Sequence, residues 1–420
     1  MNIRKIFIIK DEAPHIFFSV FIYLGCAIAL LTLPLGFQVG GNCFYLATYA
    51  SLLAFILHFK YYIKDKKNLL LPAAMLLTGL VCILWTVMYK QPDGYVVLYR
   101  QYQSTGRLQI ATAFLLAFIL NEPRSWQKQT AVLAFVAGIA VNAYALYQGI
   151  VMHIARVELN YDRATVAAYI ITVINLLFLK AALLLKRRHK VPLFLAIFII
   201  TFATLILTGT RAAMLAFPVL ALITILATKH TLSNKHKVII LALIPLMLVA
   251  CGLIFKNKIE DRLKDFQENI AMRHEQTGEN SIISRLSMQS AALHTGLQAL
   301  MGQSAEQRGE SIKLLVKKHP ELYGVLPYIT VHMHNEVMEA FSIKGIPGVV
   351  VLLALYLSLI AHSFRPQRNP VLLAITLSLI IYGLSDVIFF STEGTIIYCL
   401  GIALSILLMQ DPRVDRQTSR

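Results

Sequence analysis

Two histidines and two carboxylic acids occupy one short stretch of the chain, in which His332, His334 and Glu336 alternate and Glu339 follows. A His-x-His pair beside a glutamate is a donor set that binds divalent transition metals. The same imidazoles suit general base catalysis, because the unperturbed pKa of histidine is close to neutral pH. A third interpretation is that these polar groups only satisfy the hydrogen bonds of a loop. The spacing leaves all three open.

Two further motifs contain an arginine whose guanidinium could hold a phosphate or pyrophosphate in bidentate geometry. Arg211 lies in Thr208-Gly209-Thr210-Arg211-Ala212-Ala213, a tight turn between two apolar segments. Arg285 lies in Ser281-Ile282-Ile283-Ser284-Arg285-Leu286, within a polar segment. The ordinary alternatives are an interfacial arginine that extends to water and an arginine on a solvated helix face.

Asp386 follows Gly383-Leu384-Ser385 towards the end of an apolar segment. An ionisable residue in a membrane span is costly, so we expect it to be functional or paired. Four more arginines near the ends of apolar segments could line the approach to a site, and the sequence does not rank them: Arg100, Arg107, Arg156 and Arg163.

The composition determines which kind of chain positions these residues. Of the 420 residues, 57% are hydrophobic and 15% charged, whereas soluble globular chains have about 45–50% apolar and 25% charged residues. This excludes a soluble enzyme, a disordered chain, a collagen and a disulfide scaffold. The apolar runs exceed the roughly 10 residues of a barrel strand, so we predict an all-α polytopic membrane protein.

A membrane span needs about 20 apolar residues. By this measure the sequence predicts about twelve transmembrane helices, near residues 15–36, 41–59, 69–89, 108–121, 130–152, 164–186, 191–209, 212–228, 237–255, 345–363, 370–390 and 394–409. Arg4, Lys5 and Lys10 precede the first of them, which we interpret as an anchor rather than a cleaved signal.

The net charge of +17 follows from the same topology, because cytoplasmic loops are enriched in Lys and Arg. Most basic residues of the short loops fall at the N-terminus, in the even-numbered loops and in the tail. Both termini are therefore expected in the cytoplasm. Nucleic-acid binding is not expected, because the charges are spread over many short loops.

One connection, residues 256–344, is long and polar. Apolar residues recur in it at helical spacing, so we predict a small helical cap on the periplasmic side, between helices nine and ten. The chain then divides into residues 1–255 with nine spans, 256–344 as a periplasmic helical loop domain, and 345–420 with three spans and a cytoplasmic tail.

Three motifs of the chain resemble motifs of a known family. His334-Asn335, nine residues and then Gly345-Ile346-Pro347-Gly348 is similar to the signature of the bacterial O-antigen ligases. The Thr-Gly-Thr-Arg-Ala-Ala turn and Ser284-Arg285-Leu286 resemble the two arginine motifs of that family. The resemblance covers essentially the whole chain, within the clan of O-antigen ligases and polymerases.

The resemblance implies a multi-pass glycosyltransferase of the bacterial inner membrane that needs no metal and no cofactor. It would transfer O-antigen from undecaprenyl diphosphate to lipid A-core, in contact with membrane lipids, at a periplasmic active site. It also implies essential roles for Arg211, Arg285 and His334, and for an aspartate matched by its position to Asp386. His332 has no assigned role in that pattern and remains a secondary candidate.

The chemistry of the residues agrees with this assignment. Two arginines can stabilise a departing pyrophosphate, which we expect Arg211 and Arg285 to bind. The acceptor hydroxyl needs a base, for which His334 is the candidate, and a single displacement would invert the anomeric centre. Glu336 could orient the imidazole.

Two other functions stay open. An O-antigen polymerase of the same clan would use a polyprenyl-linked glycan as acceptor, and the motifs barely separate the two activities. A polyprenyl-glycan flippase or other transporter is the alternative from a different class. It predicts charge near the bilayer midplane and little folded mass outside, which this sequence does not have.

Overall fold

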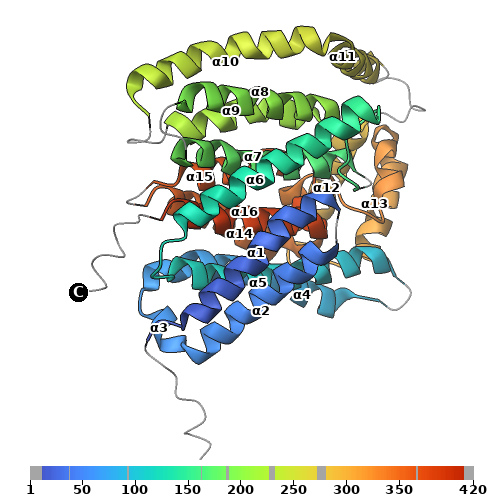
Figure 1. Ribbon diagram of the computed structural model, residues 1–420. Helices are drawn as coiled ribbons and strands as arrows, with labels where there is room; N and C mark the ends of the chain where they lie inside the picture. Colours follow the sequence, from blue (N-terminus) through green and yellow to red (C-terminus); the bar gives the residue numbers. More distant parts are fainter. Residues whose placement is uncertain are drawn as a thin grey trace, which may run out of the picture.

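The computed structural model describes residues 12–36, 38–91, 94–161, 163–185, 189–226, 232–271, 281–365 and 368–410. Within these ranges the chain is all-helical and contains no strand (Figure 1). In hydrocarbon, backbone N–H and C=O groups must be bonded within the protein, which favours helices in a chain this apolar. The basic residues at the two ends of the chain, Arg4 and Arg413 among them, lie outside the described residues.

Within the described residues, a helix overlaps each of the twelve predicted spans. These helices are α1 (Ile16–Thr32), α2 (Gln38–Leu57), α4 (Leu70–Tyr89), α5 (Val96–Leu120), α6 (Gln127–Leu146), α7 (Ala164–Leu185), α8 (Lys190–Thr208), α9 (Arg211–Leu226), α10 (Asn234–Ile254), α14 (Glu336–Ser363), α15 (Pro370–Gly383) and α16 (Thr392–Leu408). Eight of them are long and apolar enough to cross a membrane, and α9, α15 and α16 are shorter apolar helices. A multi-pass helical membrane protein is confirmed, and the count of twelve spans stays a prediction.

The helices differ in how far they are enclosed. In α7, 89% of the most apolar window is buried inside the protein, compared with 17% in α10. Figure 1 accordingly shows α10 along one edge of the bundle. Polar bonds join α7 to its neighbours, since Asn142 of α6 donates to Asn175 (2.6 Å), which also accepts from Thr201 of α8 (2.8 Å). These bonds fix the register of α8 and hence of the turn that follows it.

Helix α5 begins at Val96 rather than at residue 108. The prediction was wrong because it followed the apolar run, whereas the first turns of α5 are polar. Tyr99 and Tyr102 in these turns are nevertheless buried, and Tyr99 Oη donates to Glu306 (2.7 Å). Contacts with the segment after α10, rather than with lipid, therefore extend the helix.

Helix α14 begins at Glu336 rather than at residue 345. The Asn335 side chain caps it by accepting from the N–H groups two and three residues further on (3.1 and 3.0 Å). Gly345 then interrupts the helix with φ 64° and ψ −157°. A Cβ at that position would overlap the carbonyl oxygen of Leu300, which accepts from Ile346 N–H (2.8 Å).

The segment between α10 and α14 folds into α11 (Lys256–Ala271), α12 (Ser281–Gln298), α13 (Ala305–Lys318) and the 3₁₀ helix η6 (Pro320–Tyr328). We call this group of helices the cap. It packs at one end of the bundle, and α1 begins and α16 ends away from it (Figure 1). Trp85 donates to Gln303 O (2.9 Å), Gln303 N–H donates to Ile343 O (3.0 Å), and Tyr95 N–H donates to Glu306 (2.7 Å). The prediction that this segment is helical is confirmed for its described residues.

Candidate active site

The histidine motif lies in the loop between η6 and α14. Met333 is fully buried, and its N–H donates to Glu339 (2.9 Å). His334 N–H donates to Nδ1 of His332 (3.3 Å), and His334 has φ 46°, a left-handed conformation that few residues other than glycine adopt. The two imidazole rings consequently pack edge to face, with their centroids 4.3 Å apart.

Asp386 joins this pair from the loop after α15. That helix ends at Gly383 rather than at residue 390, which leaves Asp386 outside it. Asp386 Oδ1 lies 3.4 Å from Nδ1 of His334 and 3.8 Å from Nε2 of His332. Tyr169 of α7 donates to the other carboxylate oxygen (3.1 Å). Three residues singled out from the sequence are thus brought into one cluster.

Contacts and burial within the cluster determine the protonation states of Asp386 and His332. Burial would raise the pKa of the Asp386 carboxyl, but the neighbouring imidazoles of His334 and His332 and the backbone N–H of Val387 outweigh burial and lower that pKa below its usual range. Burial lowers the pKa of His332 to about 4, although the Asp386 carboxylate opposes this shift. At neutral pH, Asp386 is therefore ionised and His332 is neutral.

The two histidines differ in how far their side chains are exposed to solvent. The His334 side chain is 22% exposed and that of His332 is 2% exposed. The ring of Phe390 covers His332 at a centroid distance of 4.8 Å. Since Nδ1 of His334 faces Asp386, its Nε2 is the atom left to meet a substrate. His334 can therefore act directly, whereas His332 can only support it.

Glu336 is buried at the start of α14, but its role differs from the one expected. Its Oε2 accepts from the N–H groups of Ile388 (2.6 Å) and Phe389 (3.2 Å). The carboxylate that contacts the imidazole of His334 is Asp386 instead. Glu336 thus holds the backbone that follows Asp386.

Arg211 is the first residue of α9, and its side chain is half-buried. The preceding turn packs against the loop between α6 and α7, because Arg156 Nε donates to Thr208 O (3.0 Å). Lys258 of α11 donates to the same loop at Ala155 O (3.2 Å). These contacts place the Arg211 turn at the cap end of the bundle.

Arg285 lies on α12, also half-buried, four residues before Gln289. Residues four apart share one face of a helix. Gln289 donates to Leu384 O (3.3 Å), in the loop that carries Asp386. Arg285 thus lies on the face of α12 that is turned towards this loop. Within the part of the chain that the structure describes, its guanidinium makes no hydrogen bond or ion pair, so it can accept an anion.

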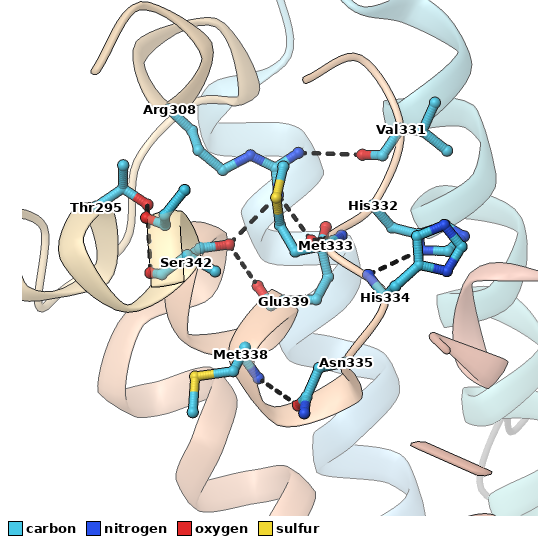
Figure 2. Close-up of polar contacts among 12 residues, drawn as sticks. Thr295, Arg308, Val331, His332, Met333, His334, Asn335, Met338, Glu339 and Ser342 are labelled. Atoms are coloured by element: carbon cyan, nitrogen blue, oxygen red, sulfur yellow. Dashed lines mark hydrogen bonds and ion pairs between the residues drawn. The ribbon is translucent and has the colours of Figure 1, made fainter. Parts of the chain in front are cut away.

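A buried ion pair holds the histidine loop in place (Figure 2). Arg308 of α13 and Glu339 of α14 are 0% and 1% exposed, with Nη1 and Oε2 2.8 Å apart. Arg308 also donates to Val331 O (3.1 Å), while Glu339 accepts from Met333 N–H. The pair therefore fastens the backbone on both sides of His332.

Sequence reasoning missed Arg308, although a signal was present. Ala305, Ile312 and Val316 are buried on α13, and Arg308 shares their face at helical spacing. An arginine on an apolar helix face requires a buried partner, because an isolated charge is costly there. Tyr169 gave no such signal, since a tyrosine in an apolar span is ordinary.

The cluster could also hold a metal. One ligand atom from each of His332, His334 and Asp386 lies within 4.8 Å of the others. Two imidazoles and a carboxylate form a donor set suited to zinc or iron. The His-x-His metal interpretation therefore stays open, with Asp386 in place of the nearby glutamate.

Comparisons with known proteins identify the family. A family model described as O-antigen ligase matches residues 196–353. The O-antigen ligase of Escherichia coli (strain K12) is 30% identical over 348 residues, which cover 81% of this chain and 82% of that protein. The matched stretch extends over both the membrane helices and the cap. The chain belongs to the O-antigen ligase family.

Proposed function

We propose that this protein transfers O-antigen polysaccharide from undecaprenyl diphosphate to a hydroxyl of lipid A-core, at the periplasmic face of the bacterial inner membrane. The contact between His334 and Asp386 at the cap end of the bundle is the observation that carries the proposal. Family membership supports a polysaccharide donor and a lipid A-core acceptor. Twelve spans, cytoplasmic termini and a periplasmic cap over residues 256–344 belong to the same proposal.

In the proposed reaction, Nε2 of His334 removes the proton from the acceptor hydroxyl. The hydroxyl oxygen forms a bond to the anomeric carbon of the donor sugar, and the bond from that carbon to the pyrophosphate oxygen breaks. The electron pair leaves with undecaprenyl diphosphate, and the single displacement inverts the anomeric centre. The Asp386 carboxylate stabilises the imidazolium that forms.

The two arginines act on the leaving group. Negative charge accumulates on the pyrophosphate as the glycosidic bond breaks, and fixed positive charge stabilises it. Arg211 and Arg285 supply that charge from α9 and α12. The half-burial of both side chains supports this role, because partial exclusion of water strengthens charge interactions.

Transfer with purified components tests the function. The purified protein is incubated with undecaprenyl diphosphate-linked O-antigen and lipid A-core, and the lipids are separated by electrophoresis. We expect the polysaccharide to move onto lipid A-core. Extension of the glycan on its polyprenyl carrier, with lipid A-core unchanged, would identify a polymerase instead.

Arg211→Lys keeps the charge but loses the planar fork. We expect this variant to lose at least about 10-fold in transfer rate, because a lysine cannot bind pyrophosphate bidentately. Arg124→Lys is the matched control, since Arg124 pairs with Glu122 (3.2 Å) far from the cap. Full activity in Arg211→Lys would reduce Arg211 to a residue that anchors the turn at the membrane surface.

Removal of divalent cations tests the role of the histidine cluster. If His334 acts as a base, activity survives exhaustive treatment with EDTA and is unchanged when Zn²⁺ or Mg²⁺ is added back. Initial transfer rates before and after chelation measure this. Loss of activity on chelation, restored by one cation, would assign His332, His334 and Asp386 as metal ligands.

A further inference from the structure

A cavity of about 250 Å³ opens beside the histidine cluster. Its walls come from three parts of the chain: α5, the start of α7 with the loop before it, and the start of α16 with η7 (Ile388–Phe390). Its polar lining includes Gln101, Asn160, Arg163, Ser391 and Glu393. Drug-sized ligands occupy about 300–1,000 Å³, so this cavity suits a single small unit.

The cavity shares a wall with the proposed active site. Phe390 lines it and also packs against the His332 ring at a centroid distance of 4.8 Å. Val166 also lines the cavity, and it lies three residues before Tyr169, the donor to Asp386, on the same face of α7. A molecule in the cavity would therefore lie against Phe390, the residue that covers His332.

Three polar side chains with unused hydrogen-bonding capacity meet at this cavity, from α5, from the loop before α7 and from α16. Within the described ranges, the Gln101 amide and the Arg163 guanidinium make no hydrogen bond or ion pair. Glu393 accepts from Ser391 (3.2 Å) through Oε2, which leaves its other carboxylate oxygen open. These groups are not needed to hold the wall together.

The wall itself is held by other bonds. Asn160 has φ 63°, and its amide donates to Leu35 O (3.1 Å) while its oxygen accepts from Tyr144 (2.6 Å). The side chain of Tyr161 is tied to Leu33 O. The loop before α7 is therefore fixed, and the cavity is formed before any ligand arrives.

A carboxylate, an amide and a guanidinium around a small cavity with an aromatic wall match the chemistry of a sugar ring. Hydroxyl groups donate to the carboxylate and accept from the guanidinium, and the amide does both. We propose that this cavity is a saccharide subsite, in which Gln101, Arg163 and Glu393 bind one sugar unit of a lipid-linked substrate next to His334. The proposal rests on the function proposed above.

This assignment distinguishes Arg163 from the other three arginines that the sequence left unranked. Arg163 lines the cavity, whereas Arg156 is bonded to the α8–α9 turn. Arg100 and Arg107 on α5 are exposed like Arg163, but they do not line the cavity. The sugar bound there can belong to the acceptor or to the donor, and kinetics separate these sources.

The test measures apparent KM for each lipid substrate while the other is saturating, using lipid A-core and undecaprenyl diphosphate-linked O-antigen. Arg163→Gln and Glu393→Gln are expected to raise one KM about 10-fold, because a hydrogen bond to a charged group is lost. The kcat at saturation stays within about twofold of the unmodified protein. Lys90→Gln is the matched control, since Lys90 is exposed at the end of α4 and outside the cavity.

A raised KM for lipid A-core alone assigns the cavity to the acceptor sugar, and a raised KM for the donor alone assigns it to the donor sugar. Unchanged KM values in both variants, or a fall in kcat with unchanged KM, would overturn the proposal. The melting temperature of each purified variant shows that it is folded. Absence of transfer by the unmodified protein is a different result, which refutes the proposed function itself.

Discussion

His334→Ala is expected to lower the rate of transfer by about 10²- to 10⁴-fold, the usual contribution of a positioned general base. The imidazole is the group of the cluster that combines contact with Asp386 (3.4 Å) and exposure of its side chain (22%). Without it, the acceptor hydroxyl must lose its proton to water. The measurement is the initial rate with both lipid substrates saturating.

His319→Ala is the control for this variant. His319 is also in the cap segment, 52% exposed, and pairs with Glu321 (3.1 Å) on the surface. The His319→Ala variant should transfer O-antigen at the normal rate. If His334→Ala, purified at the normal yield, transfers at more than about a tenth of the normal rate, His334 is not the base.

Arg308→Ala is expected to cost about 3–5 kcal/mol of stability, because it leaves a buried carboxylate without its counter-ion. Glu339 would still accept from Met333 N–H and Tyr102 Oη (2.9 Å each), but Val331 O would lose its donor. The histidine loop would keep the hydrogen bond at Met333 N–H but lose the one at Val331 O. A thermal unfolding curve of the purified protein in detergent measures the loss as a lower melting temperature.

Lys313→Ala provides the matched control on the same helix. Lys313 pairs with Glu310 (2.7 Å) three residues away, but both side chains are largely exposed. Such surface pairs contribute little, so the melting temperature should not change measurably. A melting temperature of Arg308→Ala equal to that of Lys313→Ala would show that the buried pair does not hold the loop.

The membrane helices could be predicted because their signal is local. Long apolar runs set the length of a span, and nine of the predicted ranges overlap helices with similar bounds. The starts of α5 and α14 were wrong for one reason. Both begin in polar sequence that is buried by the cap, as with Tyr99 on α5 and Glu339 on α14, and hydropathy does not register such contacts.

Only part of the candidate site could be predicted from the sequence. His334 and Asp386 were singled out by their residue types and then supported by the resemblance, but their contact joins positions 52 residues apart. The partners that support them come from other helices: Tyr169 from α7 and Arg308 from α13. No spacing along the chain relates these residues, because their proximity depends on how the helices pack.

The attachment of the cap has a consequence for how substrates arrive. Gln303 accepts from Trp85 of α4 and donates to the carbonyl of Ile343 on α14, while Glu306 is bound by Tyr99 of α5. The start of α13 is therefore tied down on three sides and cannot lift as a lid. In the proposed reaction, both lipid-anchored substrates would then have to reach His334 from the side of the bundle rather than from beneath a raised cap.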